Sequence, residues 1–163
     1  MAGRNDESNA RSGGPQAEAG AALPGTLGEL ETTVLDACAA QEQWPAQISA
    51  GVYAGVDFVI ANPGRARDWM AGAAVDSDYG SQYELVVTRF ASFIRTRAPV
   101  GARLPASTDE ALVAGIVGLV GDHVRIGRLD RLAELKPELV LLTLLPYLGF
   151  AESQRWANRS AGL

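Results

Sequence analysis

Apolar positions recur along most of this chain with the spacing of a helix, and no stretch alternates with the two-residue period of a strand. We therefore predict an all-α fold, built as a helical bundle. The predicted helices cover residues 26–43, 44–61, 63–70, 81–98, 107–127, 137–148 and 151–158, with a single turn at 130–135. Capping boxes are predicted at Thr26 with Glu29 and at Ser107 with Glu110, because this spacing satisfies unpaired backbone donors at a helix start.

Prolines and turn residues mark the predicted helix boundaries. Asn62 before Pro63 is expected to end one helix and to cap the next. Pro137 suits the first turn of a helix, and Pro146 is expected to bend or end that same helix. The segment 74–80 is predicted to be a loop.

The segment 107–127 is predicted to be the central helix, because it is apolar over most of its circumference. Two large apolar stripes run through Leu112 and through Val113. A smaller stripe consists of Ala111, Gly115, Gly118 and Asp122. The sector of Glu110, Ala114, Gly121 and Arg125 is expected to face water. Such a helix needs cover from its own domain and from a second chain, so we predict that the smaller stripe faces helix 137–148 of both its own chain and a partner.

Composition and charge favour one domain that does not bind nucleic acid by itself. The chain has 163 residues, of which 47% are hydrophobic, and this is enough for an ordinary core. Its formal net charge is −5 and it has no basic run, so a large phosphate-binding face is not expected. Residues 1–25 have too little apolar surface to offset the entropy lost on ordering. They are therefore predicted to be a disordered tail before a domain at 26–160.

The sequence shows neither a signal peptide nor a membrane-spanning segment. Its first residues lack an apolar core segment, and its longest apolar runs are far shorter than the ~20 residues of a membrane span. A soluble, cytoplasmic protein without a membrane partner is therefore expected.

The sequence offers little catalytic or metal chemistry. His123 is the only histidine and Cys38 the only cysteine, so a zinc site or a nucleophile with its base cannot be assembled. We expect no metal, no cofactor and no enzymatic activity. Cys38 is interpreted as a small buried hydrophobe. The spacing of Gly115, Gly118 and Gly121 inside a helix does not fit a phosphate-binding loop and favours close helix packing instead.

Several aromatic residues are ambiguous between core packing and the wall of a ligand cavity. This set contains Tyr53, Trp69, Tyr79, Tyr83 and Phe90. His123 is likewise either a satisfied core histidine or a group that orients a ligand. The candidate pocket residues are Tyr53, Trp69, Tyr83, Phe90 and His123, in a cavity between the helices that begin at 44, 81 and 107.

The order of these segments resembles the C-terminal regulatory domain of TetR-type transcriptional repressors over residues 30–160. The resemblance rests on Trp44-Pro45, RARDW, ALVAGIVGLVGDHV, KPELVLLTLLPYLG and PYLGFAES in this order. It implies an all-helical domain whose last two long helices, 107–127 and 137–148, form a dimeric four-helix bundle, and a pocket for a small apolar or aromatic effector. The implied interface adds Leu141, Leu144, Leu145 and Tyr147 to Ala111, Gly115, Gly118 and Asp122.

Members of that family begin with a helix-turn-helix domain, and residues 1–25 contain no such pattern. We therefore expect a ligand-responsive dimerisation domain that forms a homodimer, or a heterodimer with a full-length TetR-type regulator. The alternative is a helical protein-interaction scaffold, or such a heterodimer partner, with no ligand pocket.

Overall fold

The computed structural model describes residues 25–73, 77–102 and 104–160. These residues form seven α-helices and a 3-10 turn, and they include no strand. The elements are α1 (Gly25–Ala39), α2 (Trp44–Ala61), α3 (Pro63–Ala73), α4 (Ser77–Arg97), η1 (Val100–Ala102), α5 (Ala106–Arg125), α6 (Leu129–Leu148) and α7 (Phe150–Ser160). The predicted all-α bundle is confirmed. Of the predicted disordered tail, residues 1–24 lie outside the described residues, and Gly25 begins α1.

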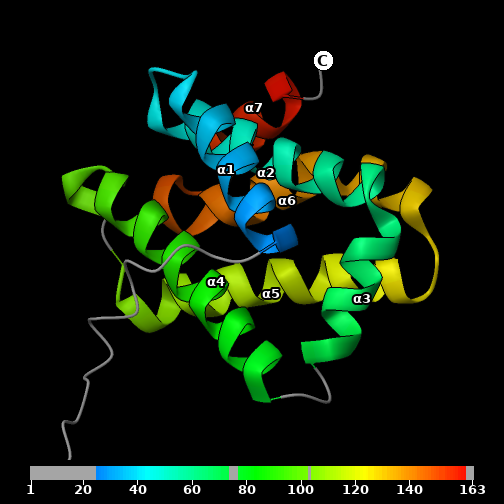
Figure 1. Ribbon diagram of the computed structural model, residues 1–163. Coiled ribbons are helices and arrows are strands. Elements are labelled where there is room, and N and C mark those ends of the chain that lie inside the picture. Colours follow the sequence, from blue (N-terminus) through cyan, green and yellow to red (C-terminus); the bar gives the residue numbers. More distant parts are fainter. Residues whose placement is uncertain (1–24, 74–76, 103, 161–163) are drawn as a thin grey trace, which may run out of the picture.

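The helices pack as two groups that face each other (Figure 1). In one group, α2 lies along α1 and α6, and α7 packs against α6. In the other group, α4 lies along α5. The groups meet where α5 contacts α6. Helix α3 packs mainly on α4 and α5 and also contacts α1 and α2 of the first group.

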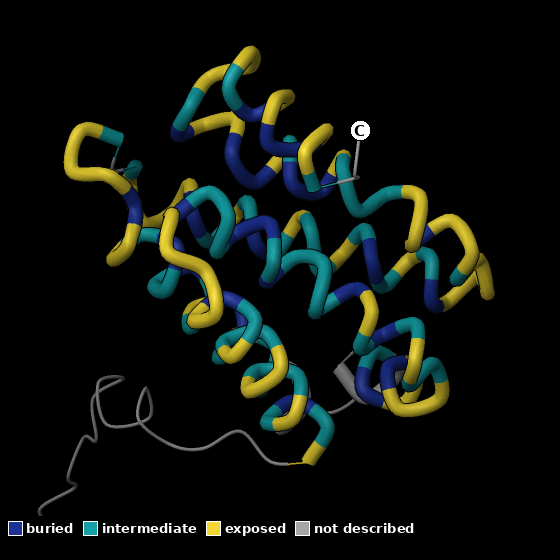
Figure 2. The backbone as a smooth tube through the Cα atoms, turned by 90° about the horizontal axis from the view of Figure 1, so that it is seen from above, coloured by how far each residue is buried: buried dark blue, intermediate teal, exposed yellow. Residues whose placement is uncertain are grey.

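In Figure 2 the buried residues lie mainly on the parts of the helices that are turned towards one another, and the exposed ones mainly on the outer parts. The largest core cluster joins Trp44 of α2, Val140 and Leu144 of α6 and Trp156 of α7. A second cluster contains Val124 of α5 and the fully buried Leu132 and Leu139 of α6. Helical spacing alone predicts most of these positions, because it puts apolar residues on one face of each helix.

Helix α6 is longer than predicted, because Pro137 lies inside it instead of starting a new helix. An interior proline leaves the carbonyl four residues earlier without its usual donor. For Pro137 that residue is Ala133, and for Pro146 it is Leu142; both are exposed. Water can reach both carbonyls, so the helix continues through each proline.

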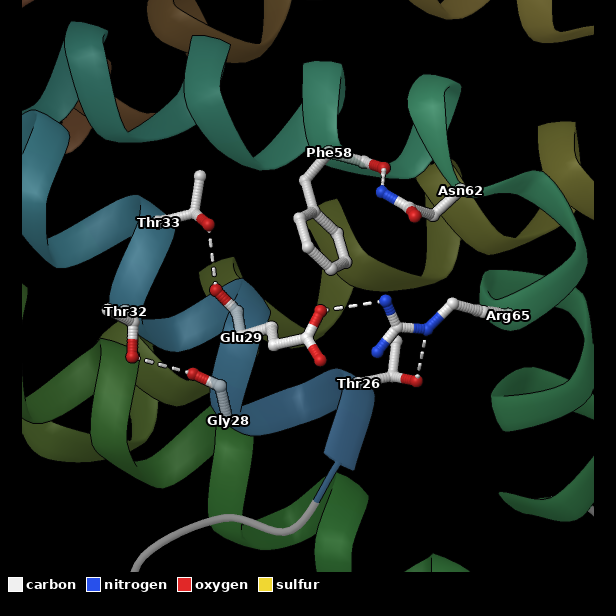
Figure 3. Close-up of polar contacts among 8 residues, drawn as sticks. All are labelled: Thr26, Gly28, Glu29, Thr32, Thr33, Phe58, Asn62 and Arg65. Atoms are coloured by element: carbon white, nitrogen blue, oxygen red, sulfur yellow. Dashed lines mark hydrogen bonds and ion pairs between the residues drawn. The ribbon is translucent and has the colours of Figure 1, made fainter.

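Both predicted capping boxes are wrong. Helix α5 begins at Ala106 after Pro105, without a side-chain cap, and Ser107 lies inside the helix. Thr26 and Glu29 also lie inside a helix, and both bind Arg65 of α3 (Figure 3). The charged partner from another helix was not visible in the local pattern.

Two other boundaries also differ from the prediction. Asn62 ends α2 as expected, but its side-chain amide donates to the Phe58 carbonyl at 2.9 Å and so closes α2 (Figure 3). The predicted loop is wrong for residues 77–80, which belong to α4. Its other residues, 74–76, lie outside the described part of the chain.

The solvent-facing side of the central helix α5 was mostly assigned to the wrong sector: of the predicted residues, Arg125 is exposed, whereas Glu110, Ala114 and Gly121 are half-buried. Ala111, Gly115, Gly118 and Asp122 are all exposed. Gly121, predicted to face water, is half-buried, because Met70 of α3 covers it: a Cβ on Gly121 would lie 3.2 Å from the Met70 sulfur. The predicted contact of the small-residue stripe with its own α6 is also wrong, since a Cβ on Gly115 or Gly118 would meet no atom within 4 Å.

Candidate functional site

An apolar cavity of about 150 Å³ lies between the two groups of helices. Its walls come from α1 and α2 on one side and from α4 and α5 on the other, with residues of α3 and α6 completing them. Its lining side chains include Leu30, Val34 and Cys38 of α1, Trp69 of α3, Phe90 of α4 and Thr143 of α6. This is the region between α2, α4 and α5 in which the sequence placed a pocket.

The cavity wall offers almost no polar chemistry. Among the described residues that line it, Cys38, Thr143 and Trp69 are the ones with a hydroxyl, thiol or indole N–H group, and none is charged. The Thr143 hydroxyl donates to the Leu139 carbonyl at 2.7 Å, so this donor is already used. The Trp69 indole nitrogen is buried and has no partner among the described residues. A neutral, apolar ligand suits such a wall, because a polar or charged group would lose its hydration without compensation.

Cys38 is an inert part of this wall. It is 2% exposed, as its interpretation as a buried hydrophobe required. Burial raises the pKa of the Cys38 thiol to about 11, and Arg97 opposes this rise only in part. The thiol is therefore protonated and unreactive at neutral pH while it stays buried.

Two of the five predicted pocket residues line the cavity. Phe90 lines it from α4 and Trp69 from α3. Tyr83 lies behind Trp69, with their ring centroids 6.2 Å apart at an interplanar angle of 25°. The Tyr83 hydroxyl points to the Ala114 carbonyl at 3.4 Å, so Tyr83 supports the wall without lining it.

Tyr53 and His123 do not line the cavity. The Tyr53 ring lies beside the Lys136 ammonium, 5.1 Å from its centroid, and Lys136 also pairs with Asp57. Burial, and then the charge of Asp57, raise the pKa of Tyr53. His123 Nδ1 lies 2.9 Å from the Leu119 carbonyl of the same helix, which satisfies that nitrogen locally.

The eight predicted interface residues divide into three kinds. Four of them, on the exposed stripe of α5, are Ala111, Gly115, Gly118 and Asp122. On α6, Leu145 is 37% exposed and Leu141 is half-buried. Leu144 and Tyr147 are buried within the chain itself, so they present little or no surface to a partner. Leu142, which was not predicted, is 46% exposed.

A buried polar cluster at one end of the core was missed by the sequence reasoning. The Asp109 carboxylate is fully buried and accepts a short hydrogen bond from the Tyr147 hydroxyl. Arg95 Nη1 lies 3.9 Å from the other Asp109 oxygen, and the Tyr147 ring packs edge-on against Trp44. The signal was present, because Asp109 is four residues before Val113 and thus on the buried stripe of α5.

The cluster lies next to the cavity. Val113 and Thr143, which line the cavity, are each one helical turn from Asp109 and Tyr147, and Ile94 of the wall precedes Arg95. Burial, followed by the hydrogen bond to Asp109, raises the pKa of Tyr147. The cluster ties α4, α5 and α6 together, and it contains no nucleophile with a base, so it does not suggest catalysis.

Charged residues also join α1 to α3 and α4. Arg65 of α3 pairs with Glu29 at 2.7 Å and donates from Nε to the Thr26 hydroxyl at 3.0 Å (Figure 3). Arg89 of α4 pairs with Glu31 at 2.6 Å. The partners are distant in sequence, so periodicity could not reveal these pairs.

Within the described residues, no group of three or more potential ligands could hold a metal ion. Nor does any helix of that part of the chain have the length and apolar character of a membrane span. A comparison with known protein families, with curated proteins and with solved structures finds no match for this chain.

Proposed function

We propose that this protein is a ligand-responsive dimerisation and regulatory domain, similar to the C-terminal domain of TetR-type repressors. The observation that carries the proposal is the cavity of about 150 Å³ with its nearly apolar wall. An apolar cavity of this size, lined by aliphatic and aromatic side chains, can hold a molecule such as benzene. The proposed effector is therefore a small, neutral, apolar molecule, for example one with a single aromatic ring.

The proposed dimer uses the outer faces of α5 and α6. On α5 the stripe of Ala111, Gly115 and Gly118 is exposed and has no neighbour above its two glycines. On α6, Leu142 and Leu145 are exposed large apolar residues spaced so that they share a face. Exposed apolar faces of this kind are typical of protein interfaces.

Ligand binding is tested by thermal shift and tryptophan fluorescence with benzene, toluene and indole. A ligand at one hundred times its Kd should stabilise the folded protein by about 2.7 kcal/mol and raise the Tm by several degrees. Phe90→Ala should weaken binding about fivefold or more, because Phe90 lines the cavity. His123→Ala is the matched control and should leave the affinity unchanged, because His123 lies outside the wall.

A second candidate function is a protein-interaction scaffold, or a heterodimer partner of a full-length regulator, with no ligand. It is favoured by the exposed Leu142 and by Phe150, which is 61% exposed at the start of α7. The ligand screen separates the two: if no apolar compound shifts the Tm and Phe90→Ala changes nothing in the screen, the scaffold is the better account.

A further inference from the structure

Helix α1 forms one wall of the cavity, and its edge along α2 is fixed by close packing. A Cβ on Gly51 of α2 would lie 2.7 Å from the Cys38 sulfur, and one on Gly55 would lie 3.4 Å from a methyl group of Val34. The missing side chains let the two helices approach closely, and many small dispersion contacts follow. Separating α1 from α2 would expose Cys38 and Val34 to water, so this edge is difficult to open.

Besides its packing on α2, α1 is held by ion pairs from two other helices, and helical spacing puts Glu29 and Glu31 on different sides of α1. Arg65 of α3 binds Thr26 and Glu29, and Arg89 of α4 binds Glu31. Figure 3 shows the Arg65 side chain reaching from α3 to the first turns of α1. Unlike apolar contacts, ion-paired groups can regain favourable interactions with water when they separate. The contacts of α1 with α3 and α4 are therefore easier to open than its packing on α2.

The Glu31–Arg89 pair lies where α1 meets α4 at the border of the cavity. Leu30, next to Glu31, lines the cavity, and so does Phe90, next to Arg89. The side chains of Arg89 and Glu31 are 25% and 14% exposed. Because the pair is partly buried, solvent and salt screen it less than they screen a surface pair. It should therefore hold α1 to α4 more firmly than the exposed Glu29–Arg65 pair holds α1 to α3.

We propose that α1 is a strap over the cavity, which opens at its edge towards α3 and α4 while it stays packed on α2. The Glu31–Arg89 pair is the latch of this strap. Opening of this kind is a local event and needs less free energy than unfolding of the whole domain. The proposal depends on the proposed function in one respect only: the opening would be the route by which a ligand enters the cavity.

Cys38 makes the opening measurable without any ligand. It is the only cysteine of the chain, it lines the cavity from α1, and its burial keeps the thiol protonated. The neutral reagent methyl methanethiosulfonate reacts with the thiolate: a disulfide forms between the Cys38 sulfur and the methylthio group, and methanesulfinate leaves. The reaction requires an accessible thiolate. Cys38 lines the cavity as well as packing on Gly51, so the reaction rate reports how often the cavity opens towards α3 and α4 while α1 stays on α2.

We expect Glu31→Gln and Arg89→Gln each to raise the modification rate of the folded full-length chain roughly five- to tenfold, as loss of a partly buried pair implies. Raising the salt concentration from 0.1 to 1 M should raise the wild-type rate in the same direction, because salt screens the pair. Asp57→Asn is the matched control. It breaks the Lys136–Asp57 pair between α6 and α2, which does not involve α1, and should leave the rate unchanged.

The urea dependence of the rate separates local opening from global unfolding. Below the unfolding transition, opening of the strap exposes little surface, so its rate should depend only weakly on urea. The proposal is overturned if both latch variants react at the wild-type rate, if Asp57→Asn accelerates the reaction as much as they do, or if the rate has the full urea dependence of unfolding. Failure of the ligand screen alone would count against the proposed function and leave the strap intact, because no ligand is used here.

Discussion

Asp109 is a charged residue in a position where helical spacing predicts an apolar one. Its carboxylate is fully buried: one oxygen accepts a hydrogen bond from the Tyr147 hydroxyl, and the other faces Arg95 Nη1 at 3.9 Å without a hydrogen bond among the described residues. A buried carboxylate is tolerated only when other groups replace the water that it loses. These two partners come from α6 and α4, so a single residue of α5 fixes the positions of two other helices.

Tyr147→Phe tests this dependence at the level of one atom. The change removes the hydroxyl that donates to Asp109 and leaves that buried acceptor without its partner, so we expect a loss of about 1 to 3 kcal/mol in the free energy of unfolding. Tyr83→Phe removes a longer bond to a neutral carbonyl and should cost less than about 1 kcal/mol. Urea unfolding measures both variants. Equal losses would show that the charge of Asp109 is not what makes the Tyr147 hydroxyl matter.

Helix α5 carries three glycines in its interior, although each costs about 0.8 to 1 kcal/mol relative to alanine. Within the described part of the chain, a Cβ would meet other atoms within 4 Å only at Gly121, where the neighbour is Met70. Gly115 and Gly118 leave open space on the exposed stripe. Contacts within this chain therefore do not explain these two glycines, whereas close approach of a second chain would explain them.

Gly118→Leu tests the dimer at this element. A Cβ at this position meets no described atom within 4 Å, so we attribute a loss of association to contact with the partner. Overpacking costs about 1 to 3 kcal/mol per site and strikes a two-fold interface twice, so the dimer Kd should rise roughly 30-fold to ten-thousand-fold. Analytical ultracentrifugation over a concentration series measures this change.

Gly64→Leu, at an exposed helical glycine of α3 that also has open space, is the control and should leave the Kd unchanged. The interface assignment fails if Gly118→Leu is as dimeric as the wild type and melts at a higher temperature. In that case the substitution would have done no more than improve helix propensity on a free surface.

At the scale of the whole molecule, two buried acidic groups make the fold sensitive to alkaline pH. Burial raises the pKa of Cys38 from 9.0 to about 11, and the pKa of Tyr147 is also raised by burial and by Asp109. The folded protein therefore keeps protons that the unfolded chain releases. The resulting stability is complete below the unfolded pKa of each group and is lost as the pH rises through the folded one.

We expect the free energy of unfolding to fall from pH 9 to pH 11, with Cys38 contributing roughly 2 to 3 kcal/mol of that fall. Urea unfolding at several pH values from 8 to 11 should show a shallower fall for Cys38→Ala than for the wild type. The comparison concerns the pH dependence only, because the smaller side chain also lowers the stability at every pH. Parallel curves for the two proteins would contradict the role of Cys38.

The sequence by itself determined the fold class, the existence of most helices and the apolar faces that build the core. These properties depend on local spacing. They were predicted well because residues three and four positions apart share a helix face, so the period of apolar residues is visible in the sequence. The end of α2 at Asn62 and the burial of Cys38 followed from the same kind of reasoning. A cavity between α2, α4 and α5 was also predicted; the cavity found there is lined by Trp69 and Phe90 of the predicted set, and by α1, α3 and α6, which were not predicted to line it.

Only the tertiary structure decided which side chains meet. Arg65 binds Thr26 and Glu29, which are 39 and 36 residues away in the sequence, and Tyr147 donates to Asp109 across 38 residues. Such pairs leave no periodic trace, so capping boxes were predicted where ion pairs exist, and the buried carboxylate was missed. The exposed face of α5 was misplaced for the same reason: whether Gly118 or Gly121 faces water depends on where α3 packs, and the spacing within α5 contains no information about that.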